Sequence, residues 1–175
     1  MRSKLLRELR NNRRMPSKTK PAARMDTTPV GRLSEAKLQQ LVGYQLAQAS
    51  ITTKRVFTRE VGQPLGLRRV EYTILMLIKE NPGCSASRLS RALDITAPNL
   101  TILISRLEQQ GLVVREQNEI DKRSLHLHVS TAGAQLATET TERLLAGEQE
   151  ALSSLSFGER ALFIELLHKV ASGRA

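Results

Sequence analysis

The sequence contains very little cysteine and few aromatic residues. It has one cysteine in 175 residues, no tryptophan, and 3% aromatic residues in total. A single cysteine, Cys84, excludes an internal disulfide framework and is typical of the reducing cytoplasm, where we expect this protein. With so few aromatic rings available, the core of one domain must consist mainly of Leu, Ile, Val and Ala, which favours a helical fold.

Long apolar segments and common enzyme motifs are also missing. The longest apolar run, 74–78, is far shorter than the roughly 20 residues that cross a bilayer. No G-x-G-x-x-G, G-x-x-x-x-G-K-[ST] or H-E-x-x-H pattern occurs, which argues against the enzymes that carry these motifs. We therefore expect a protein that is neither an enzyme nor a membrane protein, and that has no cofactor.

Positive charge is abundant, but it is concentrated at one end of the chain. The formal net charge is +10, and residues 1–24 hold nine Lys or Arg against one acid, Glu8, which leaves +2 for the rest. The segment 1–30 is expected to be a disordered basic tail. It has three interpretations: an arm that adds phosphate contacts, a solvated segment without a role, or an extension upstream of a natural start at Met25. DNA binding by the folded part must therefore be argued from motifs.

Apolar residues repeat at helical spacing in the first half of the folded part. We predict a long helix over about 33–61, broken by Gly62, Pro64 and Gly66, and a second helix over about 68–80, stopped at 81–83. The residues expected to face inward are Leu38, Leu41, Val42, Leu46, Ala49, Val56 and Val61 in the first helix, and Val70, Ile74, Leu77 and Ile78 in the second.

Two shorter helices follow, joined by a turn at Asp94 and Ile95. The first begins at Ser85, and its predicted inward residues are Ala86, Leu89, Ala92 and Leu93. The second covers about 97–110. Thr96 is a favourable N-cap for it, and its hydroxyl can accept from the backbone N–H of Asn99, because Pro98 has none. The stripe that faces the core consists of Leu100, Leu103, Ile104 and Leu107.

After Gly111 the apolar pattern changes from helical to alternating. Residues 112–115 and 125–129 are predicted to be two strands around a polar loop. A long helix from Ser130 to about 154 follows, and 157–159 separates it from a last amphipathic helix. This helix contains Leu162, Phe163, Leu166, Leu167 and Val170.

The predicted fold is mainly α with a small β-hairpin wing. Helix, turn, helix and hairpin in this order form a winged helix-turn-helix, which we assign to residues 65–133. The flanking segments 31–64 and 134–175 are expected to pack together as a helical dimerisation domain. The sequence therefore predicts a homodimer.

The helix over 97–110 is predicted to read DNA in the major groove. Its outer face is small, mixed and weakly charged, which is unusual for a solvated helix. Asn99, Thr101, Ser105 and Arg106 can hydrogen-bond base edges or phosphates, and Ile102 can contact a thymine methyl group. The alternative interpretations are an ordinary solvated face, or a winged-helix module that binds proteins and not DNA.

The wing supplies a second set of candidate DNA contacts. Lys122 and Arg123 suit phosphates or the narrow minor groove, whereas Asp121 can orient Arg123 or pair with Arg106. The complete set of expected DNA-binding residues is Ser85, Thr96, Pro98, Asn99, Thr101, Ile102, Ser105, Arg106, Lys122 and Arg123.

These motifs resemble the MarR (multiple antibiotic resistance regulator) family over roughly residues 33–173. The likeness is most specific over 89–96 (LSRALDIT), 106–113 (RLEQQGLV), 121–123 (DKR) and 130–133 (STAG). It implies a homodimer whose recognition helices bind successive major grooves of a pseudo-palindromic operator. It also implies repression that is relieved by a small, often aromatic or phenolic, anionic ligand. The family commonly has Arg and Asp where this chain has Ile102 and Ser105, so base preferences there do not carry over.

The resemblance also suggests an effector site between the dimerisation helices and the winged module. Candidates for it are Tyr44, Arg68, Arg69 and Tyr72, because a guanidinium can pair with a carboxylate and a phenol can stack or hydrogen-bond. The alternative is that these are surface cations and tyrosines at the edge of the core.

One cysteine and two histidines are candidates for oxidant sensing and metal binding. Cys84 lies just before the helix that begins at Ser85, where it is either an oxidant sensor or, as we expect, an inert small residue. His126 and His128 alternate with apolar residues and should point away from the core. A metal needs further ligands, so we expect a solvated pair and no metal.

Overall fold

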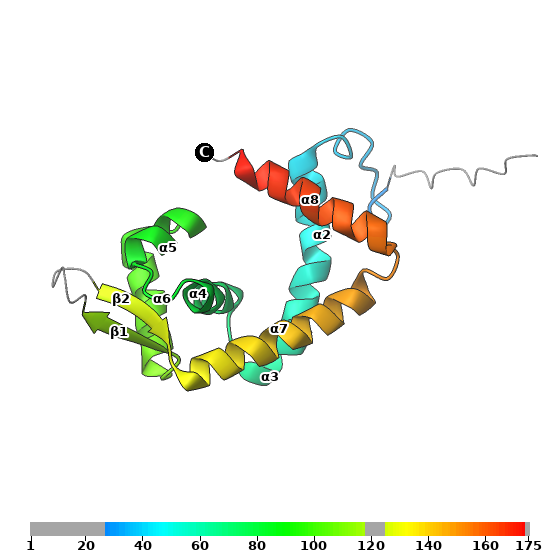
Figure 1. Ribbon diagram of the computed structural model, residues 1–175. Coiled ribbons are helices and arrows are strands. Elements are labelled where there is room, and N and C mark those ends of the chain that lie inside the picture. Colours follow the sequence, from blue (N-terminus) through cyan, green and yellow to red (C-terminus); the bar gives the residue numbers. More distant parts are fainter. Residues whose placement is uncertain (1–26, 118–124, 174–175) are drawn as a thin grey trace, which may run out of the picture. The chain divides into compact units, whose positions relative to one another are not determined.

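The computed structural model describes residues 27–117 and 125–173, and the chain divides after Gln48 into two compact units (Figure 1). The predicted basic tail and the tip of the wing lie outside the described residues. Among the described helices, none is long and apolar enough to cross a membrane.

The first helix begins later than the sequence predicted. Helix α2 spans Val42–Phe57, and the predicted start near residue 33 is wrong. The buried carboxylate of Glu35 accepts a hydrogen bond from the hydroxyl of Tyr44. Nine residues of continuous α-helix would place these two residues about 13 Å apart along the axis, so this contact requires the turns observed between them.

Of the three residues predicted to break this helix, Gly62 and Pro64 do not end the helical path, whereas Gly66 does. After α2 the chain forms a π-helix, η1 (Thr58–Gly62), and then one turn of α-helix, α3 (Gln63–Leu65). Pro64 lies in the first turn of α3, directly after the π-helical turn. The helical path ends at Gly66, which has a positive φ of 63°.

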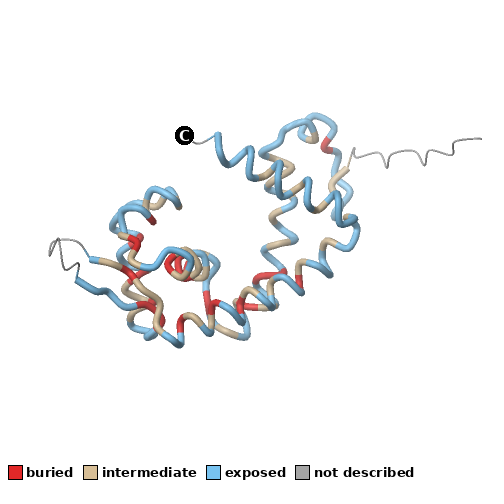
Figure 2. The backbone as a smooth tube through the Cα atoms, viewed as in Figure 1, coloured by how far each residue is buried: buried red, intermediate tan, exposed pale blue. Residues whose placement is uncertain are grey.

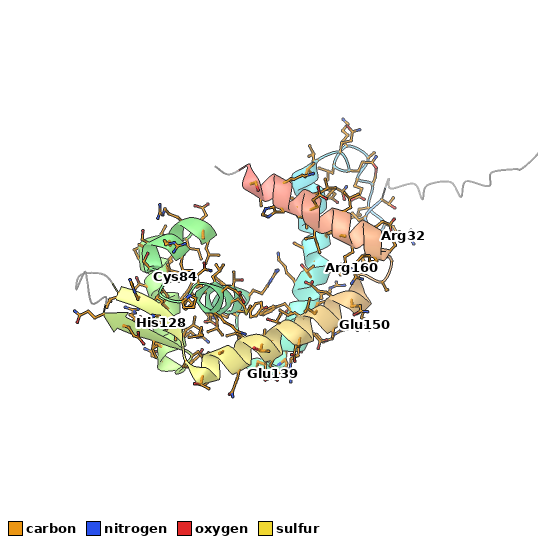
Figure 3. The ribbon with its side chains drawn as sticks, in the orientation of Figure 1. Arg32, Cys84, His128, Glu139, Glu150 and Arg160 are labelled. Atoms are coloured by element: carbon orange, nitrogen blue, oxygen red, sulfur yellow. The ribbon has the colours of Figure 1, made fainter. Side chains whose placement is uncertain are left out.

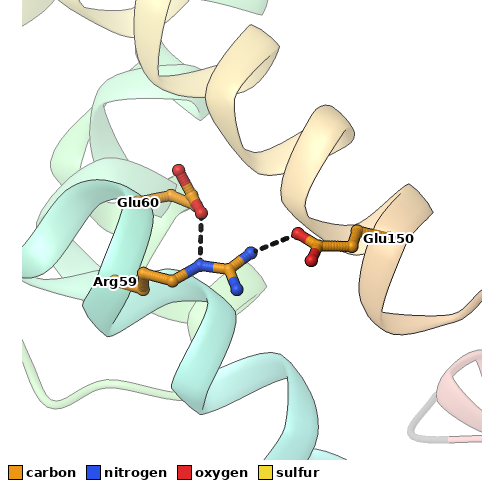
Figure 4. A network of polar contacts seen from close by, with 3 residues as sticks. All are labelled: Arg59, Glu60 and Glu150. Atoms are coloured by element: carbon orange, nitrogen blue, oxygen red, sulfur yellow. Dashed lines mark hydrogen bonds and ion pairs between the residues drawn. The ribbon is translucent and has the colours of Figure 1, made fainter.

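The helix η1 packs closely against α7 (Thr131–Ala151). A Cβ atom at Gly147 would lie 2.9 Å from side-chain atoms of Val56 and Glu60, so any larger residue would force these side chains to shift. At the rim of the contact, Arg59 pairs with Glu60 and, at 2.9 Å, with Glu150 of α7 (Figure 4). Exposed ion pairs of this kind stabilise weakly, so close backbone packing is the main determinant of this contact.

The core of the second unit is built around α4 (Arg69–Glu80). This helix packs against α6 (Ala97–Gln109), α7 and the second strand of the hairpin. The largest fully buried apolar side chains are Ile74, Leu75, Ile78, Leu100, Ile104, Leu107 and Leu127. In Figure 2 buried residues gather along these elements. The helical periodicity of α4 and α6 therefore predicted most of this core correctly. It missed the fully buried Leu75, and the predicted inward residues Val70, Leu77 and Leu103 are half-buried at its edge.

The hairpin forms a two-stranded antiparallel sheet that is joined to the loop before α5 (Ala86–Leu93). Strand β1 (Val113–Gln117) pairs with β2 (Leu125–Val129), with Val113 opposite Val129. The N–H of Leu127 donates to the carbonyl of Cys84 (3.1 Å), and the N–H of Gly83 donates to the carbonyl of Leu127 (2.9 Å). The mainly helical fold with a β-hairpin wing is thus confirmed.

Two details of the remaining helices differ from the prediction. In α5, Leu89 is buried but Ala86 and Ala92 are exposed, because this short helix contacts the rest of the fold along a narrow stripe. The last helix, α8 (Phe157–Ser172), begins where a separating segment was predicted. Its N-cap Ser156 accepts from the N–H of Glu159, and the Glu159 carboxylate accepts from the N–H of Ser156 (2.8 Å). This capping box starts the helix, and the hydrogen bonds from Ser156 lower the pKa of Glu159.

Candidate nucleic-acid interface

The turn between α5 and α6 is fixed by hydrogen bonds within the chain. Ser85 caps α5 and accepts from the N–H of Arg88 (3.4 Å). Asp94 has a positive φ of 53°, which reverses the chain after α5. The hydroxyl of Ser90 then donates to the carbonyl of Ile95 (2.5 Å). These contacts set the direction in which α6 leaves the turn.

Helix α6 has a buried face and an exposed face. On the exposed face the structure brings together Pro98, Asn99, Thr101 and Ile102, four of the predicted DNA-binding residues. The side chain of Ile102 is 68% exposed, although an isoleucine on a helix would normally be placed in a core. The Thr101 hydroxyl donates to the carbonyl of Ala97 (2.9 Å) and is held close to the helix. This face offers both polar and apolar contacts to an external partner.

The predicted cap at Thr96 is not formed by its side chain. Thr96 occupies the N-cap position, but its hydroxyl makes no capping hydrogen bond, so the predicted contact with the N–H of Asn99 is wrong. The side chain is exposed, and its backbone carbonyl accepts from the N–H of Leu100 (3.0 Å). The first turn of α6 therefore begins without the predicted side-chain cap.

Ser105 is half-buried and contacts the wing. The guanidinium of Arg115, on β1, lies 3.4 Å from the Ser105 hydroxyl and 2.9 Å from the carboxylate of Glu108. Arg115 thus connects the first strand of the wing to the last turns of α6. Sequence reasoning did not single out this residue.

Arg106 pairs with a buried carboxylate on α4. Its Nε lies 3.1 Å from Oε1 of Glu71, a side chain with no exposed surface, while 37% of the Arg106 side chain stays exposed. The sequence analysis missed Glu71. It precedes Ile74, Leu75 and Ile78 by three, four and seven residues, and a charged residue at this position of an apolar stripe is a signal that it needs a partner. Asp121, the partner considered from sequence, lies outside the described residues.

The wing contains two predicted DNA-binding residues and two histidines. Lys122 and Arg123 lie outside the described residues. His126 and His128 are half-buried on β2, and Nε2 of His128 lies 3.6 Å from the carboxylate of Glu116. In the ranges 27–117 and 125–173, no group of three His, Cys, Asp or Glu residues could hold a metal ion.

The candidate effector residues fall into separate groups. Tyr44 belongs to the first unit, where the hydrogen bond to the Glu35 carboxylate raises its pKa. Arg68 lies at the N-cap of α4, with its Nε 3.9 Å from Glu71. Only Arg69 and Tyr72 are brought together, both beside the buried ring of Phe57.

The cluster around Phe57 combines aromatic rings, a cation and a hydroxyl. The Arg69 guanidinium lies 6.0 Å from the centre of the Phe57 ring, and the rings of Phe57 and Tyr72 are 6.2 Å apart. The hydroxyl of Tyr72 contacts that of Thr141 on α7 (2.9 Å). Sequence reasoning missed Phe57 and Thr141, because neither forms a local motif.

Cys84 lies at the base of the wing, as does His128 (Figure 3). The thiol is buried, and loss of hydration raises its pKa, opposed only in part by the positive charge of Arg88. We expect a thiol-specific disulfide reagent to modify the native protein at least about 100-fold more slowly than the unfolded chain, because the thiolate is the reactive form. The measurement is the rate at which the reagent releases its own thiol at about pH 8, with and without denaturant. Comparable rates in the two states would contradict an inert Cys84.

Comparisons with known proteins give a consistent result. Residues 65–124 match the sequence model of the MarR family. A protein assigned as a transcriptional regulator of the hcr operon in Thauera aromatica is 30% identical over 129 residues, which cover 74% of this chain and 78% of that protein. An HTH-type transcriptional repressor of Mycobacterium tuberculosis is 28% identical over 109 residues, 62% of this chain and 78% of its own length.

A solved structure extends the match from sequence to fold. The transcriptional repressor CouR, in a structure bound to a 23-mer DNA duplex, superposes on this chain with a TM-score of 0.73 at 25% identity. The match covers 79% of this chain and 98% of CouR. The named relatives are thus regulators or repressors of transcription, and the similarity includes both the winged module and the flanking helices.

Proposed function

The chain belongs to the MarR family of DNA-binding transcriptional regulators, and from this we propose that it is a repressor that binds a pseudo-palindromic operator as a homodimer. In this proposal the α6 helices of two copies occupy major grooves about one helical turn, roughly 34 Å, apart on an operator of roughly 15 to 25 base pairs. The observation that carries the proposal is the exposed face of α6. Asn99 and Ile102 project from a helix whose opposite face is anchored by Leu100, Ile104 and Leu107.

Dimerisation is supported by the apolar surface of the last helix. None of the side chains of α8 is buried within the chain. Its exposed apolar residues are Phe157, Leu162, Ile164, Leu166 and Val170. Apolar area of this extent is typical of a surface that a second chain covers.

The experiment starts from random DNA. The full chain selects binding sites from a library of random duplexes, and analytical ultracentrifugation determines the number of chains on one selected duplex. We expect selected sites with two inverted half-sites and two chains on each duplex. Selected sites without two-fold symmetry, or a single chain on each duplex, would rule out the proposed arrangement.

Asn99→Ala is expected to reduce sequence selectivity. An asparagine that contacts a base edge contributes about 1–3 kcal/mol of discrimination against the wrong base, whereas non-specific binding depends on phosphate contacts. The ratio of affinities for the selected duplex and for a scrambled duplex should therefore fall by about tenfold or more, with the scrambled affinity unchanged. Fluorescence anisotropy with both duplexes measures this ratio. Equal loss on both duplexes would assign Asn99 to the phosphate backbone.

Arg123→Ala should reduce affinity and leave sequence selectivity unchanged. We propose that this wing residue contacts phosphate, so its removal should weaken binding to both duplexes alike. The slope of log affinity against log salt should decrease by about 0.9 for each phosphate that the variant no longer neutralises. An unaltered affinity and salt slope would contradict the role proposed for the wing.

We further propose that a small aromatic carboxylate releases the protein from DNA. The cluster of Phe57, Arg69 and Tyr72 supports this effector class, because it offers a guanidinium for a carboxylate and rings for stacking. Benzoate, hydroxybenzoates and cinnamates are the probes, and release from the selected duplex is the readout. Arg69→Ala should abolish release, while Arg143→Ala, on the exposed surface of α7, should not. Failure of every acid to release wild type would contradict the proposed effector class.

A further inference from the structure

Glu71 is the ionisable side chain with no exposed surface among the residues that the structure describes. It lies in the first turn of α4, beneath the helix-turn-helix. A charged carboxylate is stable in such a place only if polar or positively charged groups replace water around it. The position of those groups therefore indicates what the residue does.

The Glu71 carboxylate is held in a fixed orientation. Its Oε2 accepts a hydrogen bond from the backbone N–H of Arg68 (2.9 Å) at the start of α4. This contact places the other oxygen, Oε1, toward α6, where the Nε of Arg106 lies 3.1 Å away. Oε1 accepts no well-aligned hydrogen bond from the described residues, so its stabilisation comes from the nearby guanidinium groups. The nearest of these belongs to Arg106.

Arg106 keeps donors for a second anion. A guanidinium has five N–H donors in a rigid plane, and the Glu71 carboxylate lies 3.1 Å from its Nε. Within residues 27–117 and 125–173, the two terminal nitrogens, which carry the other four donors, have no partner, and the side chain is partly exposed. We propose that Glu71 is a positioning residue for DNA binding: its buried carboxylate holds Arg106 so that the terminal nitrogens meet a backbone phosphate when α6 lies in the major groove.

The inference rests on the proposed function, because it requires α6 to approach DNA. It changes the role of Arg106, which the sequence placed among residues that contact base edges or phosphates. A side chain held at its Nε edge cannot extend freely toward a base. It can present its two terminal nitrogens to a phosphate in a fixed orientation, and such contacts determine the register of the helix on the duplex.

The main test replaces the planar guanidinium of Arg106 but keeps its positive charge. In Arg106→Lys the single ammonium can approach Glu71 or a phosphate, but cannot reproduce a planar contact with both. We expect binding to the selected duplex to weaken about tenfold, with a salt slope lower by about 0.9. The control is Arg143→Ala, which removes a cation paired with Glu139 on α7 (2.8 Å) and should change affinity less than about twofold. Wild-type affinity and slope for Arg106→Lys would overturn the proposal.

A second variant separates positioning from folding. Glu71→Gln should weaken binding about tenfold in the wild-type background, but less than about twofold when Arg106 is already lysine, because coupled residues are not additive. Equal losses in both backgrounds would mean that Glu71 supports folding alone, and would overturn the proposal. If the Glu71→Gln variant does not fold, the affinity and salt slope of Arg106→Lys decide whether the proposal stands. Failure of wild type to bind any selected duplex would instead contradict the proposed function itself.

Discussion

Gly133→Ala is expected to lower the free energy of unfolding by about 4 kcal/mol. A Cβ atom at this position would lie 2.0 Å from the carbonyl oxygen of Leu112, far inside van der Waals contact. The carbonyl belongs to the backbone and accepts a hydrogen bond from the N–H of Ser130 (3.0 Å), and the position of a Cβ atom is fixed by its own backbone. The clash therefore cannot be relieved by rotating a side chain. Urea unfolding followed by far-UV circular dichroism measures the loss.

Two other glycines provide matched controls. Gly147→Ala brings a Cβ atom within 2.9 Å of side-chain atoms that can move, so a smaller loss of about 1–3 kcal/mol is expected. Gly158 lies in α8 with nothing within 4 Å of a new Cβ, and Gly158→Ala should stabilise the protein by about 0.5–1 kcal/mol. A loss for Gly133→Ala no larger than that for Gly147→Ala would contradict the close approach of α7 to Leu112.

Arg106→Ala is expected to destabilise the fold by about 3 kcal/mol, because it leaves the buried Glu71 carboxylate without its nearest cation. Glu71→Gln removes the negative charge but keeps an oxygen that can accept from the N–H of Arg68. The double variant should therefore recover most of the stability that Arg106→Ala removes. Urea unfolding of the four proteins in this cycle gives the coupling energy.

The control for this cycle is a cation on the surface. Arg143→Ala breaks an exposed pair on α7 and should cost less than about 0.5 kcal/mol. If the losses in Arg106→Ala and Glu71→Gln simply add, the two side chains do not interact in solution. This readout is independent of DNA and thus tests the ion pair separately from its proposed role in binding.

Elements with strong local signals were predicted well from the sequence. The apolar stripe of α6 at Leu100, Ile104 and Leu107, the turn at Asp94 and the second strand of the hairpin lie where they were predicted, and the first strand ends two residues later than predicted. Each is specified by residues a few positions apart, through periodicity or turn chemistry. The family resemblance rests on the same segments, so it was reliable for the fold.

Features that depend on distant residues were not predicted. The hydrogen bond between Tyr44 and Glu35 requires turns before α2, and the apolar residues before Val42 fit a helical repeat whether or not they are helical. The pairing of Arg106 with Glu71 joins residues on two helices that lie 35 positions apart in the sequence. A helical wheel shows which residues point outward, but not which of them find a partner on another element.

The junction between the wing and the loop before α5 affects the conformational entropy that is lost when the protein binds DNA. The backbone hydrogen bonds of Leu127 with Gly83 and Cys84 order the base of the hairpin within the chain itself. An interface that is ordered in advance loses little conformational entropy on association. In the proposed complex, contacts made beside this junction therefore contribute to affinity without a large ordering penalty, and preorganisation of the wing base becomes part of the binding free energy.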